Sequence, residues 1–318
     1  MNPVSSLEIC GKTIHPGESV HFNLTSYRLP ISDMLDTPVY VFRSIKPGPI
    51  VLLQGGMHGN ETNGVEIVRQ LVSRHGIKNP IKGTIIAIPI INIAGFIAGT
   101  RELPDGRDLN RCFPGSKNGS LGSRIAYSLT KEILSIIDFG IDFHTGGEKI
   151  NNYPQLRCSF EDARALEMAK VFEPPFILNS PYRDKSLRRE ASKKSKPILV
   201  YEAGESLRFT KLAVEQGVQG TLRLLNHLGV CAIPVPEVDH TIILNNTSWI
   251  RAKKAGLFRT TKKYGSYIEK DEIIGTISDP YGEREYDLKA PADGFLIAIN
   301  NKPVVNEGDV LIHVGYEK

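Results

Sequence analysis

Short apolar segments that alternate with amphipathic segments are the feature that most constrains how this chain folds. Residues 38–42, 50–54, 84–90, 139–143, 176–178 and 197–202 have the length and composition of strands. Residues 64–73, 121–137, 161–172 and 211–228 have apolar side chains at helical spacing, and Asn63 is the expected cap of the first of these helices. This alternation predicts an α/β/α sandwich with a largely parallel or mixed sheet.

The pattern of apolar residues changes after Pro234 and Pro236. From about residue 240 no helical pattern appears, and short strand-like segments are separated by glycines. Because 318 residues favour two domains, we predict one at 1–236, with an N-terminal β extension at 1–38, and a small all-β domain at 237–318. This second domain, the C-terminal β module, is expected to be a barrel or sandwich. Its turns at 290–294 and 305–309 resemble those of biotinyl/lipoyl carriers, but no lysine occupies the carrier position, which favours a docking wall or lid.

Composition excludes several classes of protein. A hydrophobic content of 41% and a charged content of 23% are ordinary for a soluble globular protein. No apolar run approaches the ~20 residues needed to span a bilayer, and the first residues lack a secretory signal, so we expect a cytoplasmic protein without a membrane partner. The four scattered cysteines argue against both a disulfide framework and a thiolate zinc site.

The net charge of +4 is modest, and most of the local excess lies in a basic run at residues 183–196. The run contains no interleaved aromatic side chains on which bases could stack, so we expect no nucleic-acid partner. Two interpretations stay open. The run is a solvated surface, or its field draws anionic substrates toward a nearby cleft.

A candidate metal site follows two of the expected strands. His58 and Glu61 lie on a glycine-rich turn after the strand at 50–54, and His144 follows the strand at 139–143. Two imidazoles and one carboxylate are typical ligands of catalytic zinc, which keeps a further position for water. Glu202 also lies at a strand end, where open α/β sheets form their ligand crevices. The alternative for Glu202 is a carboxylate paired with a neighbouring basic residue.

The loop at 100–115 contains three arginines and an asparagine within residues 101–111. Guanidinium groups match carboxylates in a bidentate manner, so this loop is a candidate for holding a carboxylate-bearing substrate. Composition alone leaves the alternative of a charged surface loop open.

Four ordered motifs make the chain similar to the succinylglutamate desuccinylase/aspartoacylase family of the zinc carboxypeptidase group. They are Gly-Gly-x-His-Gly-x-Glu, Asp-Leu-Asn-Arg-x-Phe-Pro-Gly, Asp-Phe-His-x-Gly and the segment 200–204 around Glu202. The resemblance extends from about residue 38 to the end. It implies a zinc-carboxypeptidase-like fold with a lipoyl-like C-terminal domain, and one Zn²⁺ per chain held by His58, Glu61 and His144.

The resemblance also implies roles for the loop at 100–115. Asp108 matches a carboxylate that orients a zinc histidine, and this role fits the need to fix an imidazole tautomer. Asn110 and Arg111 match the pair that grips the substrate's carboxylate. Arg101 matches the arginine that polarises the scissile carbonyl, with Arg107 as its competitor because the spacing of this loop varies.

Glu202 matches the general base of the family, which later acts as the acid. The predicted function is therefore hydrolysis of an amide bond in a small, carboxylate-bearing N-acyl amino acid or related amide by zinc-activated water. The alternatives are a zinc carboxypeptidase acting on short peptides and a catalytically silent binding module, and a homo-oligomer is left open. The family's further tyrosine and arginine have several candidates: Tyr264, Tyr267, Tyr281, Arg183, Arg188 and Arg189.

Overall fold

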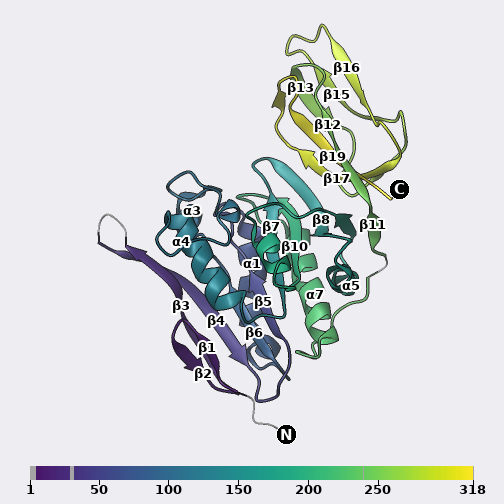
Figure 1. Cartoon of the computed structure of the whole chain (residues 1–318). Helices are drawn as coiled ribbons and strands as arrows, with labels where there is room; N and C mark the ends of the chain where they lie inside the picture. The colour runs from purple at the N-terminus through teal and green to yellow at the C-terminus, as the bar shows by residue number, and fades with distance from the viewer. Residues whose placement is uncertain (1–4, 29–31, 239, 318) are drawn as a thin grey trace.

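A computed structural model describes residues 5–28, 32–238 and 240–317 of the chain (Figure 1). Residues 1–4, which belong to the start that we interpret as lacking a signal, lie outside the described part. Within the described part, none of the helices combines the length and the apolar character that crossing a bilayer requires.

One mixed sheet forms the frame of the molecule. Its central strands β6, β5, β7 and β10 are parallel. On one side β4 runs antiparallel to β6 and β3 antiparallel to β4, and on the other side β8 runs antiparallel to β10. The central strands are almost wholly buried, as their apolar runs predict. The strands named here are β3 (Ser19–Arg28), β4 (Met34–Arg43), β5 (Ile50–Gln54), β6 (Thr84–Ile88), β7 (Phe139–Gly146), β8 (Ile150–Cys158) and β10 (Ile198–Glu205).

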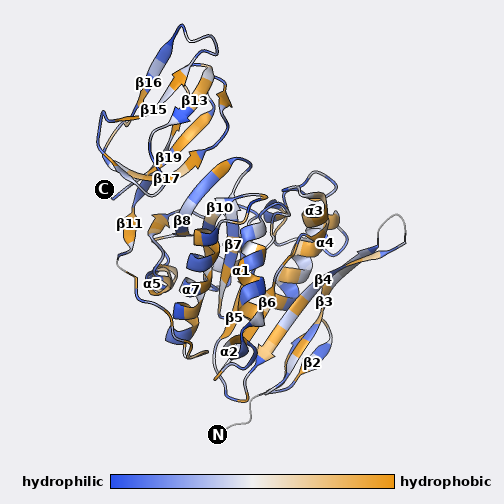
Figure 2. Ribbon diagram, turned by 180° about the vertical axis from the view of Figure 1, so that it is seen from behind, coloured by the Kyte–Doolittle hydropathy of each residue, from blue (hydrophilic) through white to orange (hydrophobic). Residues whose placement is uncertain are grey.

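Helices cover both faces of this sheet, as Figures 1 and 2 show from opposite sides. One core lies beneath α1 (Thr62–Ser73), α2 (His75–Lys78), α5 (Ala163–Phe172) and α7 (Lys211–His227). The other lies beneath α3 (Ile93–Ala98), α4 (Leu121–Ser128), α6 (Leu187–Ser192) and the β1–β2 hairpin (Leu7–Ile9, Lys12–Ile14). The expected α/β/α sandwich is therefore confirmed.

The described part of the C-terminal β module contains strands and no helix, and it has a separate apolar core. Its β17 pairs with β8, and its β11 pairs with β9, so its strands continue the sheet of the first domain. The boundary at residue 236 stays a prediction. The strands are β9 (Phe176–Asn179) of the first domain and then β11 (Ile242–Leu244), β12 (Asn246–Arg251), β13 (Gly256–Thr260), β14 (Tyr267–Ile268), β15 (Ile273–Ser278), β16 (Glu285–Lys289), β17 (Gly294–Asn300), β18 (Val304–Val305) and β19 (Val310–Tyr316).

Two local expectations differ from the structure. The expected helix at 121–137 is α4 followed by a π-helical turn, Leu129–Ile133, closed by the backbone N–H of Leu134 on the carbonyl of Leu129. Asn63 does not cap α1, because the helix begins at Thr62 and Glu61 occupies the N-cap position. Its buried amide instead donates to the carbonyls of Glu205 and Arg208 and accepts from the N–H of Thr210. Asn63 therefore fastens α1 to the segment between β10 and α7.

Replacing Asn63 by alanine leaves these backbone groups, which lie in buried and partly buried surroundings, without their partners. We expect Asn63→Ala to lower the free energy of unfolding by about 2–3 kcal/mol, since each orphaned buried polar group costs about 1–3 kcal/mol. Urea unfolding measures the change. Asn118→Ala, at an exposed position, is the matched control and should stay within about 0.5 kcal/mol of the unsubstituted protein. Equal stability of the two variants would contradict the role given to Asn63.

Candidate metal centre and active site

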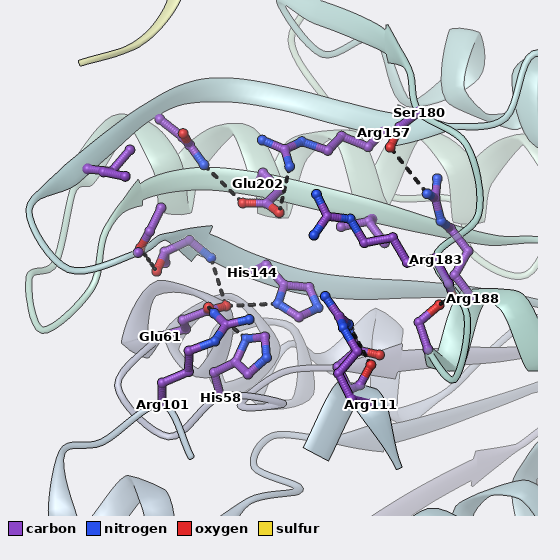
Figure 3. A pocket seen from close by; sticks show the side chains of 18 of the residues that line it. His58, Glu61, Arg101, Arg111, His144, Arg157, Ser180, Arg183, Arg188 and Glu202 are labelled. Carbon is purple, nitrogen blue, oxygen red and sulfur yellow. Dashed lines mark hydrogen bonds and ion pairs between the residues drawn. The ribbon is translucent and has the colours of Figure 1, made fainter. Parts of the chain in front are cut away.

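Three buried side chains converge at the carboxyl ends of β5 and β7 (Figure 3). One ligand atom from each of His58, Glu61 and His144 lies within 4.8 Å of the others. The two carboxylate oxygens of Glu61 lie 2.7 Å from Nδ1 of His58 and 2.8 Å from Nδ1 of His144. Two nitrogens and a carboxylate oxygen are a donor set that suits Zn²⁺, so the residues present fit the expected ion.

Parallel pairing of β5 with β7 places the two strand ends side by side, and close packing between backbones holds the turn that follows β5. A Cβ atom on Gly64 of α1 would lie 2.5 Å from the carbonyl oxygen of Phe143, so glycine lets the helix approach β7. A Cβ atom on Gly59 would lie 1.9 Å from the carbonyl carbon of Gly95, which holds the turn after His58 against α3. These two contacts position the turn of His58 and Glu61 beside His144.

Each imidazole is held from behind by a second carboxylate. Nε2 of His58 donates to Oδ1 of Asp108 at 3.0 Å, and Nε2 of His144 donates to Oδ2 of Asp142 at 2.8 Å. With a proton held on each Nε2, the loss of the proton from Nδ1 leaves a lone pair there that can bind an ion. Asp108 has the predicted partner. The equivalent position of Asp142 was missed, although side chains two residues apart on a strand share one face and signal such a pair.

Charge explains why Glu61 can stay ionised in a buried place. Burial opposes its negative charge, but the positive charge of the protonated imidazoles of His58 and His144 holds the pKa of the carboxyl well below its ordinary value. The backbone N–H of Thr145 also donates to Oε2 at 3.1 Å. At Asp108 burial is likewise opposed, here by His58 and Arg101, and the pKa is low. The centre therefore presents an anionic oxygen to a cation.

The structure separates the two competing arginines of the loop. Arg101 lines the pocket, and its guanidinium donates to Glu61 at 3.1 Å and to Asp108 at 3.0 Å. Arg107 is exposed, lies 3.6 Å from a carboxylate oxygen of Asp105 and is not among the residues of the pocket. The loop thus brings Arg101, but not Arg107, to the candidate centre.

Asn110 and Arg111 line the same pocket from the short helical turn η1 (Leu109–Arg111). Oδ1 of Asn110 accepts from the backbone N–H of Leu187 at 2.9 Å, which ties the loop to the start of α6. Among the described residues, the N–H groups of the Asn110 side-chain amide have no hydrogen-bond acceptor. Arg111 likewise has no carboxylate within ion-pair distance there. The pair can therefore donate to an anionic ligand.

Glu202 lies on β10, next to His144 in register on β7. Its carboxylate accepts from Nδ2 of Asn152 at 2.9 Å and lies 3.3 Å from Nη1 of Arg157. The pairing with a basic residue that we gave as an alternative is thus present, and it coexists with a position in the pocket beside the His-Glu-His cluster (Figure 3).

The pocket that unites these groups has a volume of about 240 Å³. Its remaining wall includes Asn152, Arg157 and Trp249, which our sequence reasoning missed, as well as Arg183 and Arg188 from the basic run. Those two arginines favour the interpretation that the run faces a cleft. Neither Arg189 nor any of the three candidate tyrosines lines the pocket: Tyr281 is 85% exposed, Tyr264 packs on Tyr153, and Tyr267 packs on Phe295.

The mixed sheet and the polar pocket at its carboxyl edge define the class of the protein as an α/β enzyme with a candidate metal centre. The chain belongs to the succinylglutamate desuccinylase/aspartoacylase family, because the family model described as "Succinylglutamate desuccinylase/Aspartoacylase catalytic domain" matches residues 47–228. The resemblance drawn from the four motifs is confirmed. The family is one of deacylases, which act on amides.

Named relatives agree with this assignment. N-alpha-acetyl-L-2,4-diaminobutyric acid deacetylase of Halomonas elongata is 27% identical over 278 residues, which cover 83% of this chain and 81% of the relative. The succinylglutamate desuccinylase/aspartoacylase structure from Rhodobacter sphaeroides has a TM-score of 0.82 at 25% identity over 95% of this chain and 96% of that one. The product-bound Ectoine utilization protein EutE (DoeB) from Ruegeria pomeroyi, at 22% identity, shares the fold with a TM-score of 0.84 over 99% of both chains.

The carboxylate behind His144 generates a prediction about metal affinity. We expect Asp142→Asn to weaken metal binding by about 10–100-fold, because a neutral amide raises the basicity of the imidazole less than a carboxylate does and orients the ring less firmly. Competition with a chromophoric chelator measures the affinity. Asp138→Asn is the control, because Asp138 precedes β7 and caps the N–H of Ile50 far from the cluster. Unchanged affinity in Asp142→Asn would remove the proposed support of His144.

Proposed function

We propose that this protein is a zinc-dependent amidohydrolase that removes the acyl group from a small N-acyl amino acid. The observation that carries the proposal is that Glu202 and the His58–Glu61–His144 cluster line one pocket. The name of the Halomonas elongata relative, a deacetylase of an acylated diamino acid, supports the same chemistry. One Zn²⁺ per chain, held by the cluster, would lower the pKa of a bound water to ~7 and polarise a carbonyl.

Glu202 is the general base of the proposed reaction. Its carboxylate is held by Asn152 and Arg157, so it meets the attacking water in a fixed orientation. It accepts a proton as the water attacks the amide carbonyl, and it later gives that proton to the leaving amine nitrogen. Since the carboxylate is only partly covered, with 15% of the side chain exposed, water can reach it.

Arg101 stabilises the negative charge that develops on the carbonyl oxygen. Two of its five N–H donors are used by Glu61 and Asp108, and the others remain for the oxyanion. Donors that are already in position stabilise the oxyanion without a reorganisation of the site, and this lowers the activation free energy. Arg101 therefore has the charge and the position for this role.

Asn110 and Arg111 bind the carboxylate of the substrate. The start of α6 fixes Asn110, and Arg183 and Arg188 add positive charge to the same side of the pocket (Figure 3). A guanidinium fork beside an amide donor matches a planar carboxylate. This arrangement supports a carboxylate-bearing substrate, and in an N-acyl amino acid that carboxylate lies on the amine side of the scissile bond.

The size of the pocket favours a small amide over a peptide. About 240 Å³ is below the usual range of about 300–1,000 Å³ for ligand sites, and Trp249 of the C-terminal β module forms part of the wall. We therefore place the carboxypeptidase alternative second. Turnover of N-acyl amino acids but not of dipeptides and tripeptides by zinc-loaded protein separates the two. The cytoplasmic location stays a prediction, and the oligomeric state stays open.

The role of Glu202 gives a first prediction on activity. We expect Glu202→Ala to reduce kcat by about 10²–10⁴-fold, because the step loses its general base, while zinc content stays near one per chain. Metal analysis and initial rates on N-acyl amino acids are measured together. Glu205→Gln, on the same strand but outside the pocket, is the control and should keep its rate. Chelation should abolish turnover and added Zn²⁺ restore it. A Glu202→Ala enzyme with most of its turnover would refute the assignment.

The two loop arginines form a matched pair for a second prediction on activity. We expect Arg101→Ala to lower kcat by about 10²–10³-fold, the usual loss when an oxyanion donor is removed. Arg107→Ala removes the same charge from the same loop and should leave kcat within about threefold, because its side chain points to solvent. Steady-state kinetics measure both variants. Equal losses would mean that net charge, and not position, determines the effect.

A further inference from the structure

The pocket has two chemically different ends, and β8 runs between them. Arg157 lies near the end of this strand, where Ser180 and Arg188 also line the pocket. Ile150 and Asn152 lie near the beginning of the strand, beyond Glu202. The candidate centre and Glu202 lie between, so a bound amide points one of its substituents toward each end.

The end near Arg188 is suited to an anion. Arg188 is 92% buried and donates through Nη2 to Ser180 and to the carbonyl of Pro181, but its Nη1 has no hydrogen-bond partner. Arg183 and Arg111 face the same space without a carboxylate in ion-pair contact among the described residues (Figure 3). The carboxylate of the substrate belongs at this end, as in the proposed function.

The opposite end is less polar. Ile150 and Trp249 line it together with the amide of Asn152. Of the cations that line the pocket, Arg157 is already paired with Glu202, and Arg101 with Glu61 and Asp108, within the described structure. A second carboxylate placed here would lose water without gaining a free cation.

The position of Trp249 follows from strand register. Asn152 of β8 is opposite Ala298 of β17, Ala298 is opposite His313 of β19, and His313 is opposite Trp249 of β12. Directly opposed residues of antiparallel strands point to the same face, so this row carries Trp249 onto the face of Asn152. Between Glu202 and Gly204, β10 advances two residues while β8 advances three. This bulge turns Asn152 to the face of Glu202.

A stacked partner holds the indole in place. The rings of Trp249 and His313 lie 4.3 Å apart with an interplanar angle of 3°. Burial and the nearby Arg157 lower the pKa of His313 to about 3, so the imidazole is neutral at physiological pH. A neutral buried ring gives the tryptophan a fixed, uncharged backing.

We propose that Trp249 determines the acyl specificity of this protein by forming the wall of the pocket that receives the acyl group. In an N-acyl amino acid the acyl group and the carboxylate lie on opposite sides of the scissile bond. With the carboxylate at the arginine end, the acyl group meets Ile150 and Trp249. The pocket therefore takes a short aliphatic acyl group, such as acetyl, in preference to a dicarboxylic one, such as succinyl. This inference rests on the proposed function and selects among its substrates.

Acyl selectivity tests the proposal by kinetics. The substrates are the Nα-acetyl, Nα-hexanoyl and Nα-succinyl derivatives of glutamate and of lysine, with zinc-loaded protein. We expect kcat/KM for acetyl to exceed that for succinyl at least tenfold. Trp249→Ala should raise the hexanoyl-to-acetyl ratio of kcat/KM at least tenfold, and Trp249→Phe should keep most of the original selectivity.

Tyr281→Ala is the matched control, since it removes an exposed aromatic ring of the same module. Its ratios should equal those of the unsubstituted protein, and thermal unfolding should show that Trp249→Ala stays folded. A preference for succinyl, or a Trp249→Ala variant that slows all acyl substrates by one factor, overturns the proposal. A purely structural role of the tryptophan predicts that uniform loss.

Binding provides a readout that does not need turnover. Trp249 is the one tryptophan of the chain, so tryptophan emission reports on this wall alone. In the Glu202→Gln variant, the acetyl and hexanoyl derivatives should shift or quench the emission, and the unacylated amino acids should not. An emission change without hydrolysis by the unsubstituted protein supports the wall and refutes the proposed function. Hydrolysis without any emission change refutes the wall alone. If both are missing, both proposals are wrong.

Discussion

The carboxylate of Glu61, shared between two buried imidazoles, is the interaction on which the site depends. Burial disfavours its charge, and the convergence of His58, His144, Arg101 and the N–H of Thr145 keeps it ionised. That convergence requires α1 to approach β7 closely, which Gly64 permits. A carboxylate behind each imidazole then fixes the ring orientation. The centre is thus assembled by the packing of one helix against one strand.

Much of the architecture and of the centre could be predicted because it follows from local patterns. Parallel strands end at one edge of a sheet, so polar residues placed after apolar runs, such as His58, His144 and Glu202, are brought together whatever the details of packing. The loop arginines show the limit of this reasoning. Arg101 and Arg107 are equivalent in composition, and only the folded loop turns one inward and the other toward solvent.

The missed residues depend on features without a local signature. Asn152 faces Glu202 because of a bulge, and a bulge of one residue reverses the side chain without changing the pattern around it. Trp249 reaches the pocket through three successive strand pairings, which together connect it to Asn152, about a hundred residues earlier in the chain. Asn63 looked like a helix cap because such residues often are, but here tertiary contacts claim its amide.

The pairing of β17 with β8 has a consequence for how molecules come and go. Backbone hydrogen bonds continue from β10 through β8, β17 and β19 to β12. The C-terminal β module is therefore joined to the first domain by a shared sheet as well as by its linker. A rotation of the module away from the first domain would break the backbone hydrogen bonds between β8 and β17. We therefore expect substrate entry and product release to depend on side-chain rotations, which occur in picoseconds to nanoseconds, and not on slow hinge motions of the whole module.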